Sequence, residues 1–196
     1  ANLLFAILKK LFKHYISISY IMNLKDHIRS IPNYPKKGIL FRDITTLIKN
    51  EKAFAATIDL IIERSKKYKI DKIAAIESRG FVFASAVSYM LKKPFILLRK
   101  KNKLPAETYS VDFELEYGTA TIEVHKDSID KDDSILIIDD LIATGGTAEA
   151  AARLVEISKG KVSAFIFVIN LFDLGGCDKL INKNYKVENL MEFPGH

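Results

Sequence analysis

The sequence has little that could form a disulfide bond or a transition-metal site. It contains a single cysteine, Cys177, so no internal disulfide can form, and a reducing cytoplasm is the simplest setting. The four histidines are scattered, and none stands at zinc-ligand spacing from a cysteine or another histidine. We therefore expect a cytoplasmic protein without a transition-metal centre, in which Cys177 is a small packing residue.

A long apolar run near the N-terminus is also missing. The uninterrupted run at residues 3–8 is far too short to cross a bilayer. In a secretory signal peptide positive charge precedes the apolar run, whereas here the lysines follow it. We expect residues 1–21 to be an extension outside the core, with Met22 near the natural start, and we expect no membrane partner. An amphipathic surface or organelle-targeting helix is the alternative.

The excess of positive charge is modest. The formal net charge is +6, and half of it comes from the three lysines of residues 1–21. The remainder gathers at residues 99–103, RKKNK, where a small anionic substrate explains it as well as a nucleic acid does. The chain is 48% hydrophobic and has no internal repeat or low-complexity linker. We expect one globular domain, residues 22–196, and no nucleic-acid partner.

Apolar runs alternate with helix-like segments along the chain. Short apolar runs predict buried strands, and segments with apolar residues at helical spacing predict helices. The predicted strands are 72–77, 95–99, 161–170, 185–190 and the run that begins at 135, and the predicted helices are 51–69, capped by Asn50, and 80–91. Residues 100–118 are polar and predict a loop or a long hairpin. This alternation predicts an α/β fold, with a central, mostly parallel sheet covered by helices on both faces.

Two adjacent carboxylates and a glycine turn follow the buried strand at 135–138. The sequence from 139 to 147 is DDLIATGGT, and an Ala-rich helix comes next. Glycines allow close approach to a ligand, and the free N–H groups of a helix start favour an anion. Neither the Walker lysine nor a G-x-G-x-x-G pattern is present. Carboxylates beside a phosphate cradle fit a ribose diol.

We therefore predict ribose 5-phosphate binding by this segment. Asp139 and Asp140 would accept hydrogen bonds from the hydroxyls. The phosphate would be held by Ala143, Thr144, Gly145, Gly146 and Thr147. The alternative is an acidic turn that only caps a helix.

The segment resembles the phosphoribosyl pyrophosphate signature of the type I phosphoribosyltransferases. Segments 32–47, 77–83, 97–105 and 114–127 are similar to those of the family members that act on adenine. The resemblance runs from about residue 22 to about residue 174, in the order found in the family. It implies the type I phosphoribosyltransferase fold with a small N-terminal hood, about 32–47, and a lid, about 100–118. It also implies transfer of the 5-phosphoribosyl group from phosphoribosyl pyrophosphate to adenine, giving AMP and pyrophosphate in purine salvage.

The same resemblance implies roles for single residues. Pyrophosphate would be bound by Glu77, Ser78 and Arg79, with a cis peptide at Glu77–Ser78, and by Arg99, Lys100 and Lys103, in part from the neighbouring subunit of a homodimer. Glu116 would be the catalytic acid at adenine N7, and Tyr117 would help to hold the closed lid. Adenine would lie against Leu40, Phe41, Arg42 and Leu171. Mg²⁺ would be held mainly through the substrate, with Asp139 as a candidate ligand, because no cluster of protein ligands is evident.

Purely structural interpretations of these residues, and two other functions, stay open. The basic run can be a solvated surface, Phe41 and Leu171 can be ordinary core, and Glu116 can be an exposed carboxylate at a strand end. Some regulators resemble this fold and bind the same ligand without catalysis, although residues 1–21 lack a helix-turn-helix pattern. An enzyme of the same class that acts on another purine is the third possibility.

Overall fold

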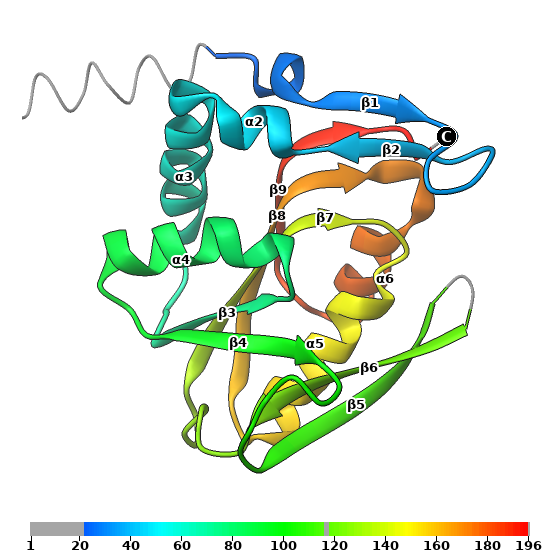
Figure 1. The fold of residues 1–196 in the computed structure, drawn as a ribbon. Coiled ribbons are helices and arrows are strands. Elements are labelled where there is room, and N and C mark those ends of the chain that lie inside the picture. Colours follow the sequence, from blue (N-terminus) through cyan, green and yellow to red (C-terminus); the bar gives the residue numbers. More distant parts are fainter. Residues whose placement is uncertain (1–21, 116–117, 196) are drawn as a thin grey trace, which may run out of the picture. The chain divides into compact units, whose positions relative to one another are not determined.

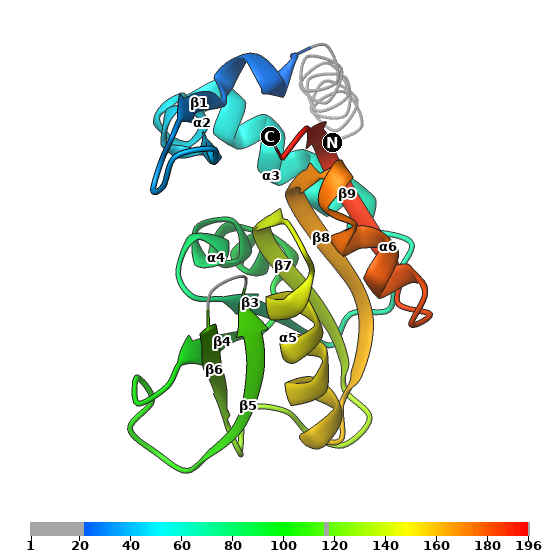
Figure 2. The ribbon, with the colours of Figure 1, turned by 90° about the vertical axis from the view of Figure 1, so that its right-hand side faces the viewer.

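The computed structural model describes residues 22–115 and 118–195. The described residues form two compact units, which divide between Glu63 and Arg64. Figures 1 and 2 show the elements of both units in two views. No described helix is both long enough and apolar enough to cross a membrane.

The N-terminal unit is built around a short antiparallel hairpin. Its elements are η1 (Leu24–His27), β1 (Arg29–Pro32), β2 (Leu40–Asp43), α2 (Thr45–Lys49) and most of α3 (Glu51–Ser65). In the hairpin, Arg29 is opposite Asp43 and Pro32 is opposite Leu40. The Asn50 side chain accepts a hydrogen bond from the Ala53 backbone N–H at 2.9 Å, as expected of a helix cap.

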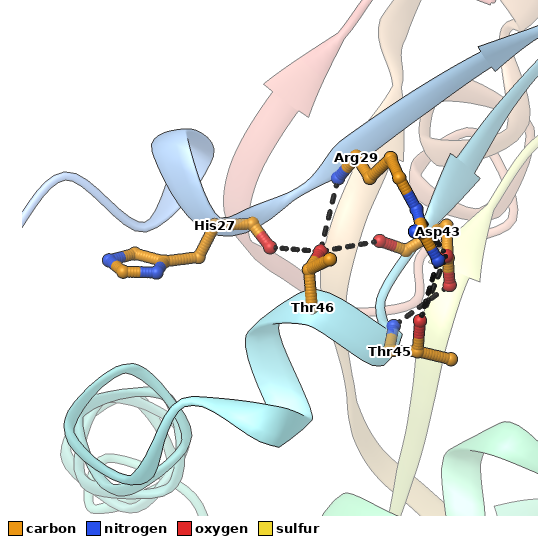
Figure 3. A network of polar contacts seen from close by, with 5 residues as sticks. All are labelled: His27, Arg29, Asp43, Thr45 and Thr46. Atoms are coloured by element: carbon orange, nitrogen blue, oxygen red, sulfur yellow. Dashed lines mark hydrogen bonds and ion pairs between the residues drawn. The ribbon is translucent and has the colours of Figure 1, made fainter.

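A polar network fastens the hairpin to α2 (Figure 3). Asp43 accepts from Arg29 Nη2 at 2.5 Å, from the Thr45 backbone N–H at 2.9 Å and from Thr45 Oγ1 at 2.8 Å. Thr46 Oγ1 donates to the His27 carbonyl at 2.7 Å. The Thr45 N–H, with the Arg29 guanidinium, holds the pKa of the Asp43 carboxyl below its usual range, although burial opposes the shift. The network therefore keeps Asp43 ionised and fixes the end of β2.

The C-terminal unit is a seven-stranded sheet with the order β5-β6-β4-β3-β7-β8-β9. The parallel strands are β3 (Lys72–Ile76), β4 (Phe95–Lys100), β7 (Ser134–Ile142), β8 (Lys161–Leu171) and β9 (Val187–Phe193). At one edge, β6 (Gly118–His125) runs antiparallel to both β4 and β5 (Thr108–Leu115). The segment expected to be a loop or long hairpin thus contributes β5 and the start of β6.

Helices cover both faces of this sheet. They are α4 (Arg79–Leu91), α5 (Gly146–Ile157) and α6 (Gly176–Ile181), with the single turn η2 (Phe172–Leu174) before α6. Phe81 of α4 packs edge-on against Phe95 of β4. The next β4 residue, Ile96, belongs instead to the core formed with the alanines of α5. Because successive strand residues point to opposite faces, α4 and α5 lie on opposite sides. The predicted mostly parallel α/β sheet is confirmed.

The predicted boundaries of α3 and β9 are wrong by a few residues. The predicted helix 51–69 ends at Ser65. A turn follows, and the Tyr68 hydroxyl donates to Glu188 at 2.6 Å. The last strand begins at Val187 and not at Tyr185, because the Tyr185 ring packs on Phe165 and its hydroxyl donates to Glu156. In both cases a tertiary contact of a tyrosine outweighs the local pattern.

Candidate active site

The candidate site lies at the carboxyl ends of β3 and β7 in the C-terminal unit. These strands are parallel neighbours, and each leads into a helix, α4 after β3 and α5 after β7. The free N–H groups at both helix starts therefore lie at the same edge of the sheet, where ligands of open α/β sheets bind. Gly145, the N-cap of α5, has a φ of +80°, a conformation that favours glycine.

Asp139 and Asp140 lie within β7 and not after its end. The strand continues to Ile142, because Leu141 and Ile142 still pair with Ile169 and Asn170 of β8. Our expectation that the strand ends before the aspartates is therefore wrong. The longer strand holds both carboxylates within the sheet. The predicted phosphate loop begins directly after the strand, at Ala143.

The two aspartates are electrostatically coupled to each other and to Arg79. Arg79 Nε lies 2.9 Å from Asp140 Oδ2, and the Asp140 backbone N–H donates to Asp139 Oδ1 at 2.9 Å. Burial, reinforced by the charge of Asp140, raises the pKa of Asp139 well above its usual range. Burial also raises the pKa of Asp140, and the Arg79 guanidinium opposes that shift. Hydroxyls of a ligand or a cation at this site would therefore stabilise the ionised forms of the two carboxylates, which burial disfavours.

Gly80 allows α4 to approach the carboxylate pair. A Cβ at this position would lie 2.7 Å from Asp139 Oδ1 and 3.0 Å from the Ile138 carbonyl oxygen. Both distances are too short for any residue but glycine without a shift of β7 or α4. Gly80 is not among the site residues predicted from the sequence, although a glycine inside a helix start is a signal of close approach.

An ion pair joins Glu77 and Arg99, two of the residues predicted to bind pyrophosphate. The Glu77 carboxylate accepts from Arg99 Nε at 3.2 Å and from the Lys100 backbone N–H at 3.0 Å. Arg99 Nη1 donates to the Lys103 carbonyl at 3.0 Å. Burial alone would raise the pKa of Glu77, but the Lys100 N–H and the Arg99 guanidinium lower it overall. The ionised Glu77 side chain therefore holds Arg99 in place, and the Glu77–Ser78 peptide is cis, as expected.

The predicted adenine residues divide between the two units. Leu171 is buried at the end of β8 in the C-terminal unit. Leu40, Phe41 and Arg42 lie in β2 of the N-terminal unit. There the Phe41 ring packs edge-on against Tyr34, and Arg42 Nη1 donates to Ser30 Oγ at 2.5 Å. Their role toward a purine stays a prediction.

Glu116 and Tyr117 lie outside the described residues, whereas the flanking strands pair up to Leu115 and Gly118.

Among residues 22–115 and 118–195, no group of three or more Asp, Glu, His or Cys side chains is arranged to hold a metal ion. The carboxylates of Asp139 and Asp140, in the strand that leads into the predicted phosphate loop, suit a hard cation such as Mg²⁺ bound mainly through its other ligands.

A mostly parallel sheet with paired aspartates and a glycine loop at the end of β7 defines a type I phosphoribosyltransferase. The phosphoribosyl transferase domain model matches residues 43–188. Over 175 residues the chain is 83% identical to the adenine phosphoribosyltransferase of Pelagibacter ubique (strain HTCC1062), covering 89% of this chain and 100% of that protein. The chain belongs to the adenine phosphoribosyltransferase family.

Solved structures of relatives agree with this assignment. The crystal structure of adenine phosphoribosyltransferase from Thermoanaerobacter pseudethanolicus superposes with a TM-score of 0.84 at 45% identity and covers 87% of this chain and 98% of that chain. The Saccharomyces cerevisiae enzyme, solved with an imino-altritol bisphosphate and adenine, superposes with a TM-score of 0.80 at 36% identity, with coverages of 91% and 99%.

Proposed function

We infer that this protein transfers the 5-phosphoribosyl group from phosphoribosyl pyrophosphate to adenine and releases AMP and pyrophosphate, a purine-salvage reaction. The observation that carries the inference is the Asp139-Asp140 pair in β7, directly before a glycine loop that opens α5. This arrangement occurs in a chain 83% identical to an adenine phosphoribosyltransferase. The Saccharomyces cerevisiae relative was crystallised with adenine, which supports adenine as the base used here.

Binding of the donor follows from the chemistry of each loop. The N–H groups of residues 144–147 would hold the 5′-phosphate at the start of α5. Asp139 and Asp140 would accept hydrogen bonds from the ribose hydroxyls, which would stabilise the ionised carboxylates that burial disfavours. Ser78, Arg79, Arg99, Lys100 and Lys103 would bind the pyrophosphate, and Glu77 would orient Arg99. The donor would thus be held on both sides of the C1 atom that reacts.

We propose Mg²⁺ as the cofactor, bound mainly through oxygens of the substrate. The described residues offer Asp139 and Asp140 and no larger acidic cluster near the loop, and such sparse protein ligation is usual for Mg²⁺. When bound, Mg²⁺ would neutralise part of the charge of the departing pyrophosphate.

Catalysis and base recognition would use residues whose roles the sequence resemblance suggests. Glu116 would exchange a proton or a hydrogen bond with adenine N7 as the bond to N9 forms. Tyr117 would help to close the lid over the reacting sugar and exclude water. Leu40, Phe41, Arg42 and Leu171 would form the slot for the base. Residues 32–47 would act as a hood over the adenine.

We propose that the protein is a cytoplasmic homodimer. Val82 and Tyr89, seven residues apart on α4, are 37% and 72% exposed, and Leu97 of β4 is 39% exposed. Arg99 is on the same face of β4 as Leu97, so a second copy that covered these apolar groups would come close to the pyrophosphate residues. A sedimentation mass of one chain would contradict the dimer.

The single free thiol of Cys177 suits the cytoplasm, and recovery of the protein outside the cytoplasmic fraction would contradict that location.

The function is tested by mixing the protein with phosphoribosyl pyrophosphate, Mg²⁺ and one purine at a time. We expect AMP and pyrophosphate from adenine, far less product from hypoxanthine or guanine, and loss of activity when EDTA removes the metal. Binding of phosphoribosyl pyrophosphate without any nucleotide product would instead indicate a regulator. Faster turnover of another purine would assign a different substrate to the same reaction.

Glu77 provides a prediction for the pyrophosphate side of the site. Glu77→Gln replaces a carboxylate that accepts from Arg99 and from the Lys100 N–H with a weaker acceptor. We expect KM for pyrophosphate in the reverse reaction to rise about tenfold, because Arg99 loses its charged partner, with KM for AMP little changed. Glu107→Gln is the control, since Glu107 is 84% exposed and its ion pair with Lys126 lies at the surface. An unaltered KM for pyrophosphate in Glu77→Gln would refute the orienting role.

A further inference from the structure

Gly175 is the N-cap of α6 and Gly176 is its first residue, directly after η2, and neither is among the residues predicted to bind the substrate. Gly176 is buried against the phosphate loop, residues 143–147. A Cβ on Gly176 would lie 2.2 Å from the Ala143 carbonyl oxygen and 2.8 Å from the Gly145 backbone nitrogen. The start of α6 thus touches the backbone of the loop with no room for a side chain.

Gly145 of the loop likewise has no room for a side chain against Gly176. A Cβ on Gly145 would lie 3.0 Å from the Gly176 carbonyl oxygen and 3.1 Å from its Cα. The next loop residue, Gly146, approaches β5: a Cβ there would lie 3.0 Å from the Glu114 carbonyl oxygen. The loop is therefore in close backbone contact with two elements, α6 and β5, and a displacement at Gly176 would be hard to absorb by simple relaxation.

We propose that Gly176 is a positioning residue for the 5′-phosphate of the substrate, an inference that rests on the proposed function. Gly176 does not touch the phosphate. It lets α6 support the backbone between Ala143 and Gly145, so that the N–H groups at the start of α5 converge on the position of the 5′-phosphate. Preorganised donors of this kind lose their effect when they move by about 1 Å, which can cost up to about 100-fold.

Gly175 provides the matched control. It has a φ of +71°, and a Cβ there would meet no atom within 4 Å. Gly175→Ala therefore strains its own backbone but leaves the phosphate loop untouched. The two substitutions add the same methyl group to adjacent residues, and only Gly176→Ala pushes on the loop.

The test compares the full-length wild-type protein with Gly175→Ala and Gly176→Ala. Steady-state kinetics give kcat and KM, calorimetry gives the affinity for ribose 5-phosphate, and thermal unfolding gives Tm. For Gly176→Ala we expect KM for phosphoribosyl pyrophosphate and Kd for ribose 5-phosphate to rise about 10- to 100-fold, with KM for adenine within about twofold. For Gly175→Ala we expect Tm to fall by a few degrees and both constants to stay within about twofold of wild type.

Several outcomes would overturn the proposal. If the wild type makes AMP but Gly176→Ala keeps the wild-type KM for phosphoribosyl pyrophosphate, the positioning role is wrong and the function stands. An equal loss of adenine affinity and phosphate affinity would also refute it, because that pattern indicates general unfolding. If the wild type makes no AMP, the proposed function fails, and the ribose 5-phosphate affinities of the two variants still test the contact.

A measurement on the wild type covers the case in which Gly176→Ala does not fold. Ribose 5-phosphate is added to ¹⁵N-labelled protein, and the backbone amide signals of the glycines are followed by NMR. We expect the signals of Gly145 and Gly176 to shift together. The signal of Gly160, which packs against Ile129 and Val155, should stay in place. A Gly176 signal that does not move while that of Gly145 does would contradict the proposal.

Discussion

Replacing Glu116 with glutamine should lower kcat about 100- to 1,000-fold and leave the KM values for adenine and phosphoribosyl pyrophosphate within about threefold. Glutamine has the shape of glutamate but cannot take up or release a proton at adenine N7 while the bond to N9 forms. An interaction needed only in the transition state contributes to kcat and little to substrate binding. Pre-steady-state and steady-state kinetics separate the two effects, and circular dichroism checks the fold.

The matched control is Glu114→Gln. Glu114 is an exposed residue of β5, two positions before Glu116, and it stands opposite Thr119 of β6. The same chemical change should leave kcat near that of the wild type there, because an exposed strand carboxylate has no contact with the reacting atoms. Wild-type turnover in Glu116→Gln, or an equal loss in both variants, would remove Glu116 as the catalytic acid.

Asp139→Asn is expected to weaken donor binding and to stabilise the fold at neutral pH. The amide loses the charge that makes Asp139 a strong acceptor for ribose hydroxyls, so KM for phosphoribosyl pyrophosphate should rise about 10- to 100-fold. The pKa of Asp139 is raised in the folded protein, chiefly by burial and then by the charge of Asp140. Ionised Asp139 therefore costs stability that a neutral side chain does not cost.

The pH dependence of this stabilisation has a definite sign. Below the unfolded-state pKa of about 4, Asp139 is protonated in both states, so wild type and variant should have similar unfolding free energies. The wild type then loses stability relative to Asp139→Asn as the pH rises toward the higher pKa of the folded state, and the gap stays constant above it. Urea unfolding between pH 4 and 8 measures this gap.

Two comparisons make the result for Asp139 specific. Asp127→Asn, at an exposed residue outside the sheet, should change neither KM nor the pH profile. Asp140→Asn should also raise KM for phosphoribosyl pyrophosphate, but it breaks the ion pair with Arg79, so its stability gain should be smaller. An unaltered KM in both site variants would contradict the role of the pair in binding the diol, and a pH-independent stability difference would contradict the raised pKa of Asp139.

Local sequence patterns predicted the strands and helix starts that short segments of the chain specify by themselves. The apolar run at 135–138 and the Thr-Gly-Gly-Thr turn specify a buried strand that leads into a helix start, and β7 and α5 have this order. The alternation of such strands with helices implied parallel pairing, because each helix returns the chain to the same edge of the sheet. Family resemblance then supplied the cis Glu77–Ser78 peptide, which spacing and composition could not.

Contacts between distant segments were beyond the reach of the sequence. The ion pair between Glu77 and Arg99 joins two different strand ends, and the fit of Gly176 against Ala143 joins the start of α6 to the loop after β7. The extra length of β7 comes from its ladder with β8, which no pattern within β7 encodes. Such features depend on three-dimensional packing; of the three, only the fit of Gly176 leaves a trace in the sequence, the glycine itself.

A crystal structure of the protein with AMP would show directly where the nucleotide binds. We expect the 5′-phosphate to accept hydrogen bonds from backbone N–H groups of residues 144–147 and the ribose hydroxyls to lie within hydrogen-bond distance of Asp139 and Asp140. Density for the nucleotide bound elsewhere, with the end of β7 and the start of α5 free of ligand, would contradict this binding mode.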